Sequence, residues 1–260
     1  MNKTRIVDLS VLVSEDYPGG WPSHMPFQRK PINWYGKEGA SEAAPFRVSG
    51  RGPYYTEWLI IDEHTGTHFD AAAHFMEDPS QVDGPYTGDQ VDLAIFHGTA
   101  AVIDVSDLEE GAGPGISPEI PAVAIETWEQ RNGRLEAGEV VLFRTAWDRY
   151  YVSGDCGRRY AHDVLVTAKT AGWPAPGVDA MKVLYDRGVR CVGTDAPSMG
   201  MSHDGVPVHR WGLSRGMVYI ELLTNLAALP ERGAPFVFLP IKVAGSSGGP
   251  GRAIAYLNED

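Results

Sequence analysis

Apolar residues fall in short runs separated by turn residues along most of the chain. Runs rich in β-branched and aromatic residues predict strands. They cover 6–13, 57–61, 99–105, 139–145, 189–193, 235–244 and 252–257. One helix is expected from Ser117-Pro118 to about Arg131, and another over 178–186. Strands and helices alternate irregularly and without a repeat, which predicts a single α/β domain over 1–260 around a mixed sheet.

Residues 18–55 break this pattern. The segment is rich in proline, glycine and aromatic residues and has no clear period. A loop of this length in a compact domain is usually functional or disordered, and the aromatic content argues against disorder. We therefore expect an ordered segment that covers a site or contacts another subunit.

The composition narrows the classes of partner. The chain has 260 residues, 43% of them hydrophobic, and a formal net charge of -12 without a basic patch. This charge disfavours nucleic acid and anionic lipid as partners. No apolar run approaches the roughly 18 residues of a membrane span, and we identify no signal peptide. With only Cys156 and Cys191 and no C-x-x-C pair, we expect a cytoplasmic protein.

The candidate chemistry lies in one short motif, H-T-G-T-H-F-D at residues 64–70. The ligand atoms of a divalent ion lie at roughly 2.0 to 2.2 Å from it, and so within a few ångströms of each other. An ideal strand would hold His64 and His68 about 13 Å apart, and a helix would turn Asp70 away from His68. Gly66 therefore has to provide a turn that gathers the three side chains.

Beyond this turn, Asp70 is placed to cap a helix that would bring His74 within reach of a metal-bound water. An unrelated group of surface histidines is the alternative. However, the chain has eight histidines, and three of them fall within eleven residues. Histidine and carboxylate groups of this kind are typical ligand sets, so the motif predicts a metal site. It differs from the zincin motif H-E-x-x-H, because Thr65 occupies the glutamate position.

A second cluster of polar residues, His203, His209 and Glu221, lies further along the chain. Glu221 is within an apolar run, and a buried carboxylate is rarely left unpaired because burying its charge is costly. Two explanations remain open from the sequence: an ion pair with Arg210 or Arg215, or a metal ligand.

The motif at 64–70, followed by His74, resembles the signature of the cyclase-like metal-dependent hydrolases. This family includes bacterial kynurenine formamidase and isatin hydrolase. Further segments that resemble the family are D-L-S at 8–10, G-T-D-A-P-S at 193–198, E-L-L-T-N-L at 221–226, L-P-I-K at 239–242 and G-G-P-G-R-A at 248–253. The resemblance thus covers nearly the whole chain. It departs at Ala72, where many members have proline.

The resemblance implies a mixed α/β fold with a barrel-like β core and flanking helices, in a homo-oligomer such as a dimer or tetramer. It also implies that His64, His68 and Asp70 hold zinc or manganese, with one or two ions per chain. In members with two ions, Asp70 bridges to a second ion at the positions of His209 and Glu221.

The expected reaction is hydrolysis of an amide, cyclic imide or formamide bond in a small aromatic substrate. The resemblance assigns His74 as the acid/base that takes a proton from water and returns it to the leaving group. Phe69, Trp21 and Trp34 are candidate substrate contacts, although aromatic residues more often build cores and interfaces. The alternatives are lactone hydrolysis, cyclisation or dehydration at the same metal, and a metal-binding protein without turnover.

Overall fold

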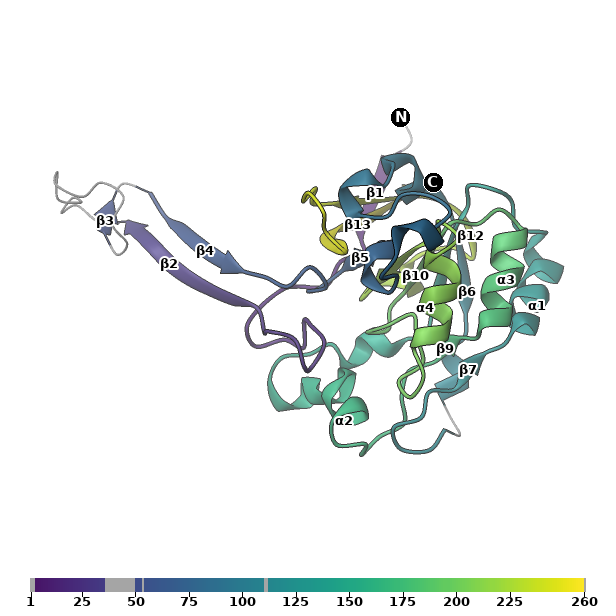
Figure 1. Ribbon diagram of the computed structural model, residues 1–260, viewed down its shortest axis with the longest axis horizontal. Helices are drawn as coiled ribbons and strands as arrows, with labels where there is room; N and C mark the ends of the chain where they lie inside the picture. Colours follow the sequence, from purple (N-terminus) through teal and green to yellow (C-terminus); the bar gives the residue numbers. More distant parts are fainter. Residues whose placement is uncertain (1–2, 36–49, 53, 110–111, 260) are drawn as a thin grey trace.

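The computed structural model describes residues 3–35, 50–52, 54–109 and 112–259 (Figure 1). Within these residues, the main sheet has eight strands. Their order is β1 (Lys3–Asp8), β13 (Gly248–Glu259), β12 (Arg232–Pro240), β6 (His97–Asp104), β8 (Val140–Arg144), β10 (Cys191–Thr194), β11 (Val218–Glu221) and β5 (His68–Asp70). Because β13 also pairs with β5, all of these strands except β1 close into a barrel.

The helices and the smaller sheets surround this barrel. α1 (Ala122–Asn132), α3 (Val178–Asp186) and α4 (Val206–Leu213) lie together beside it, and α2 (His162–Leu165) lies apart from them (Figure 1). The short strands β7 (Glu119–Ile120) and β9 (Ala175–Pro176) pair with each other. The expected fold class, a mixed sheet with a barrel-like core and flanking helices, is confirmed. No helix in the described part of the chain is long and apolar enough to cross a membrane.

Side-chain alternation along the strands builds two cores. On β8, Val140 and Leu142 belong to the core inside the barrel, whereas Val141 and Phe143 belong to the core beneath the helices. Successive side chains of a strand point to opposite faces, so a strand buried on both faces is a continuous apolar run. The inner core includes Phe69, Phe96, Phe236 and Phe238.

The barrel closes where β5 lies between β11 and β13, antiparallel to both strands. Gly248 pairs with Asp70 at this closure. A Cβ atom at Gly248 would lie 2.2 Å from the carbonyl oxygen of Phe69 and 2.9 Å from the ring of His64. Glycine at this position therefore permits the close approach of β13 to the histidine motif.

An arm projects from the barrel (Figure 1). It consists of β2 (Gln28–Tyr35) and β4 (Thr56–Ile60), which pair antiparallel, and β3 (Gly50–Gly52), which pairs with β2. Trp58 and Leu59 are 58% and 61% exposed, and as consecutive residues of β4 they point to opposite faces. Both faces of the arm thus carry a large exposed apolar side chain.

Most expected strands are present, and the expected helix over 178–186 is α3. The run at 6–13 is a strand only to Asp8. The segment 18–55 is not a loop throughout, because β2 and β3 lie within it; residues 36–49 and 53 are outside the described residues.

Two further predictions of local structure were wrong. The helix expected from Ser117 begins at Ala122, because residues 119–120 pair with β9 and the Ser117 hydroxyl binds Ser202. Asp70 does not cap a helix. It is the last residue of β5, and a short 3-10 turn (Ala72–His74) follows it.

Candidate metal centre

The turn that the motif requires is present at Gly66. Its φ of +65° is a left-handed conformation that glycine adopts without strain. His64 precedes the turn, and β5 follows it with His68 and Asp70 on the same face. The ring centroids of His64 and His68 are consequently 4.9 Å apart. The prediction that a turn at Gly66 gathers the motif is confirmed.

Three histidines converge on two carboxylates at this face. Asp70 Oδ1 lies 2.9 Å from His64 Nδ1 and 3.5 Å from His68 Nε2. Asp70 Oδ2 lies 3.5 Å from His209 Nε2. Glu221 lies 3.6 Å from His68 Nε2 and 3.3 Å from His209 Nε2. None of the five side chains is more than 9% exposed, so the motif forms one buried site with His209 and Glu221 of the second cluster.

Hydrogen bonds orient two of these rings toward the carboxylates. His68 Nδ1 lies 2.8 Å from the carbonyl oxygen of Gly66, and His209 Nδ1 lies 2.6 Å from that of Gly205. A carbonyl only accepts, so each Nδ1 carries a proton and each Nε2 faces inward. Asp70 Oδ2 is buried without a hydrogen-bond partner among the described residues. Imidazole nitrogens and carboxylate oxygens arranged in this way fit a divalent metal.

The electrostatics of the site also favour a cation. Burial raises the pKa of Asp70, but the surrounding histidines, His74 foremost, hold it well below its usual range. Burial lowers the pKa of His209, but the neighbouring carboxylates of Asp70 and Glu221 raise it to about 10. The buried carboxylates of Asp70 and Glu221 therefore favour a positive charge between the rings. A divalent ion can supply this charge, and its ligands release protons when it binds.

His74 lies beside the cluster, on the turn that follows β5. Its ring stacks on that of His64, with centroids 3.8 Å apart and planes 26° apart. Ligand-type atoms of His64, Asp70 and His74 lie within 4.8 Å of one another. Burial lowers the pKa of His74 below its ordinary value, although Asp70 opposes this shift. A histidine that is neutral at this position can accept a proton.

The contacts of Glu221 test one of the two explanations left open by the sequence, the ion pair with an arginine. Its Oε1 accepts a hydrogen bond from the Met199 amide at 2.6 Å and one from the Ser198 hydroxyl at 3.4 Å. Among the described residues, no arginine pairs with Glu221, so the ion-pair explanation was wrong. His203 is not part of the site, because its Nδ1 accepts from the Ser117 amide.

The three candidate substrate contacts lie in different places. Trp21 lines the cavity at the site, together with two of the motif histidines. Phe69 is 1% exposed and packs against other phenylalanines inside the barrel, because alternation along β5 points it away from the histidines. Its placement contradicts the expected substrate contact. Trp34 lies on β2 of the arm, and its side chain is outside the described residues.

The cavity at the site is narrow. It has about 30 Å³, which is room for about one water molecule. Pro18, Gly20 and Trp21 form part of its wall, and the Gly66 amide donates a hydrogen bond to the Gly19 carbonyl. Residues 18–21 therefore cover the histidine motif, as expected for part of the segment 18–55.

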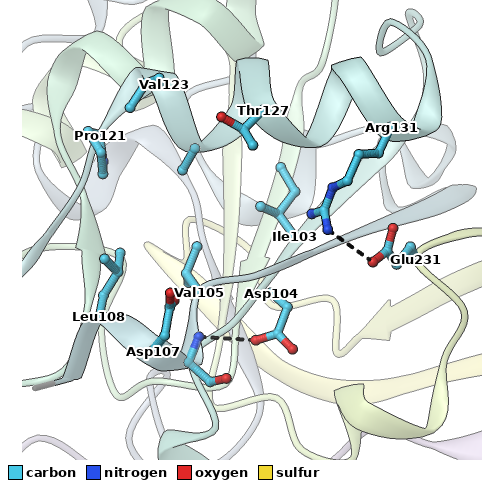
Figure 2. Close-up of a pocket in the computed structure, with 12 residues that line it drawn as sticks. Ile103, Asp104, Val105, Asp107, Leu108, Pro121, Val123, Thr127, Arg131 and Glu231 are labelled. Carbon is cyan, nitrogen blue, oxygen red and sulfur yellow. Dashed lines mark hydrogen bonds and ion pairs between the residues drawn. The ribbon is translucent and has the colours of Figure 1, made fainter.

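A much larger hollow of about 660 Å³ lies between the end of β6 and α1 (Figure 2). Asp104, Asp107, Arg131 and Glu231 border it, and an Arg131 nitrogen lies 3.9 Å from a Glu231 oxygen. Among the described residues, the groups with metal-ligand spacing lie at β5 and not at this hollow. The chemistry of the residues, and not the size of the cavity, therefore identifies the candidate site.

Two residues that support the site were missed in the sequence. Ser247 is 183 positions from His64, yet its Oγ lies 2.9 Å from His64 Nε2. Glu63 accepts a hydrogen bond from this hydroxyl at 2.6 Å. Glu63 adjoins the motif, so its position was a usable signal. Ser247 reaches the site only through closure of the barrel, which no local pattern indicates.

Comparisons with known proteins agree with the motif resemblance. The family described as "Putative cyclase" matches residues 7–200. An isatin hydrolase of Roseibium aggregatum is 32% identical over 214 residues, which are 79% of this chain and 76% of the relative. A kynurenine formamidase of Salinibacter ruber is 30% identical over 75% of this chain and 77% of the relative.

Solved structures give the same result. Isatin hydrolase A from Labrenzia aggregata, bound to benzyl benzoate, has a TM-score of 0.76 and 26% identity, covering 98% of this chain and 94% of that chain. Isatin hydrolase A from Ralstonia solanacearum has a TM-score of 0.75 and 29% identity, covering 98% and 92%. The chain therefore belongs to the cyclase family, and its relatives place it among the enzymes that hydrolyse carbon–nitrogen bonds other than peptide bonds.

Proposed function

We propose that this protein is a metal-dependent hydrolase that opens a small cyclic amide, or cleaves a formamide, attached to an aromatic ring. The observation that carries this proposal is the convergence of three buried histidines on two buried carboxylates, beside a further histidine placed for proton transfer. The isatin hydrolase and kynurenine formamidase relatives support the substrate class.

The metal we propose is zinc or manganese, with one or two ions per chain. His64, His68 and Asp70 would hold the first ion. His209 and Glu221 would hold a second one, with Asp70 shared. The two oxygens of Asp70 face different histidines, which suits such sharing. A bound divalent cation supplies Lewis acidity and lowers the pKa of water toward about 7.

The residues of the chain then handle the proton. His74 accepts a proton from the attacking water as its oxygen forms a bond to the carbonyl carbon. The carbon–nitrogen bond breaks, and His74 returns the proton to the leaving nitrogen, so the reaction needs no covalent nucleophile. Stacking against His64 holds the His74 ring in place for both transfers.

The substrate would enter beside Trp21, whose ring offers an aromatic face at the cavity wall. A cavity of about 30 Å³ cannot hold a fused aromatic ring, because ligand sites of this kind span roughly 300–1,000 Å³. We therefore propose that residues 18–21 shift outward when substrate binds.

We also propose that two or more copies of the chain assemble through the arm. A small sheet needs a hydrophobic face packed against other structure to be stable, and this one exposes Trp58 and Leu59 on opposite faces. Arg29 of β2 pairs with Glu57 of β4 at 3.9 Å, so the exposed apolar side chains, and not charge, support this contact. Both cysteines are free, which suits the cytoplasmic location that we propose.

The function is tested by loading the purified protein with zinc or manganese and supplying isatin, formanilide and the lactone dihydrocoumarin. We expect ring opening of isatin or release of aniline, and we expect a chelator to abolish it. Turnover of the lactone alone would instead favour the lactonase alternative. Absence of turnover of all three compounds by metal-loaded protein would contradict the proposal.

A further inference from the structure

A chain of hydrogen bonds runs outward from the back of His64. His64 Nε2 lies 2.9 Å from Ser247 Oγ, and Ser247 Oγ donates to Glu63 Oε2 at 2.6 Å. The backbone amide of Ser247 donates to the same glutamate oxygen at 2.7 Å. The carbonyl of Ser247 accepts from the Ala71 amide at 2.8 Å. Ser247 is thus fixed at its amide, its carbonyl and its hydroxyl.

The direction of these hydrogen bonds follows from the number of protons. A serine hydroxyl has one proton, and the short distance to Glu63 is typical of a bond to a carboxylate. That proton is therefore not available to His64, and Ser247 Oγ must accept from His64 Nε2. His64 Nε2 therefore carries a proton. Nδ1 lies 2.9 Å from the carboxylate oxygen Asp70 Oδ1 and donates to it, and this Nδ1 proton is the one that a bound ion would displace.

This arrangement is the reverse of that at the other two histidines. His68 and His209 are protonated on Nδ1 by backbone carbonyls and face the carboxylates with Nε2. A carbonyl enforces this tautomer by itself. At His64 the partner is the Ser247 hydroxyl and not a carbonyl, and a hydroxyl can either donate or accept a hydrogen bond. The tautomer of His64 therefore depends on Glu63, which fixes the direction of the Ser247 hydroxyl.

We propose that Glu63 and Ser247 are positioning residues that hold His64 in the tautomer with Nδ1 free for the metal. This inference rests on the proposed function, since it assigns the role of two further residues at the same site. Metal affinity would then depend on Ser247, which directly precedes β13 and lies 183 positions from His64 in the sequence.

The test compares zinc affinity, measured by competition with a chelator, in the wild type, Ser247→Ala and Glu63→Gln. We expect each variant to bind zinc about 10- to 100-fold more weakly, the range found when groups that orient a ligating histidine are removed. In Glu63→Gln the amide can donate to Ser247, which frees the hydroxyl proton for His64 Nε2 and favours the wrong tautomer. Ser247→Thr keeps the hydroxyl and should restore most of the affinity.

Two controls separate this role from a general loss of structure. Ser106→Ala removes a hydroxyl far from the site and should leave zinc affinity unchanged. Melting temperatures of the metal-free variants report whether they fold. If Ser247→Ala is unstable, Glu63→Gln alone tests the positioning role. In addition, ¹⁵N NMR of histidine-labelled, zinc-loaded wild type should show the His64 proton on Nε2 and the His68 and His209 protons on Nδ1.

Unchanged zinc affinity in both variants, or a proton on His64 Nδ1 in the zinc-loaded wild type, would overturn this inference and leave the proposed function intact. A wild type that binds neither zinc nor manganese would overturn both. Weaker binding in both variants, with rescue by Ser247→Thr, would support the positioning role.

Discussion

The histidine motif and the arm are neighbours in the sequence, but they follow opposite rules of burial. The motif buries His64, His68 and Asp70, and each of these side chains faces an oppositely charged or hydrogen-bonding group. The arm exposes large apolar side chains, Trp58 and Leu59 among them. Buried charge is tolerated only when it is compensated, and exposed apolar surface usually marks a contact. The motif thus finds its partners within one chain, whereas for the arm we propose contact with a second copy.

The largest effect is expected from His74→Ala, which tests the acid/base role of this histidine at the buried site. We expect the rate of hydrolysis to fall about 10²- to 10⁴-fold, because general acid–base catalysis contributes that much, while bound metal remains. Steady-state kinetics and elemental analysis of the same preparation check both parts. His97→Ala, an exposed histidine outside the site, is the control. A variant that keeps the wild-type rate would remove His74 from the mechanism.

Self-association through the arm is tested by the double variant Trp58→Ser, Leu59→Ser. Each side chain contributes roughly 1.5–3 kcal/mol when buried, so self-association should weaken about 100-fold or more. Analytical ultracentrifugation measures the assembly, and metal content should not change. Val123→Ser, at an exposed position of α1, is the matched control. If the wild type is a monomer, the proposed role of the arm is wrong.

Closure of the barrel behind the motif is tested by Gly248→Ala. The added methyl would overlap the Phe69 carbonyl, so β13 has to move away from β5. We expect the free energy of unfolding to fall by about 2 kcal/mol, a typical effect of overpacking, with weaker metal binding. Gly113→Ala adds a methyl that meets nothing within 4 Å. Chemical denaturation of the two variants should separate them, and equal stabilities would contradict the tight closure.

The smallest effect is expected at an ion pair away from both regions, between Glu129 of α1 and Arg187. The Arg187 guanidinium contacts both carboxylate oxygens and lowers the pKa of Glu129. A lowered folded-state pKa stabilises the protein above the unfolded pKa, and this stabilisation is lost as the pH falls through the folded pKa. Glu129→Gln should cost about 1 kcal/mol at neutral pH and nearly nothing in acid.

Denaturation midpoints at several pH values check this prediction, with the exposed Glu77→Gln as control. A difference between wild type and Glu129→Gln that does not vary with pH would show that the pair acts through packing and not through charge.

The local sequence predicted the turn at Gly66, the buried strands and the convergence of the motif, because each depends on neighbouring residues. It did not predict that Asp70 ends a strand. The pairing partners Tyr219 and Gly248 determine that, and they lie far along the chain. The orientation of Phe69 follows from the same pairing. Once β5 is a strand, Phe69 between His68 and Asp70 has to face away from both of them.

The sequence predicted only part of the second cluster. The apolar neighbours of Glu221 indicated that it is buried, but its partners Met199 and His209 could not be predicted, because only the fold brings them to it. Ser247 had no signal at all, because its role arises from barrel closure. Long-range pairing therefore accounts for most of what the sequence alone did not predict.

Metal binding is tested most directly by elemental analysis of the purified protein and of His68→Ala after exposure to zinc and manganese. We expect one or two ions per chain in the wild type, and loss of bound metal in the variant, which removes a ring that faces both Asp70 and Glu221. A wild type that binds no stoichiometric metal, or a variant that binds as much as the wild type, would contradict this expectation.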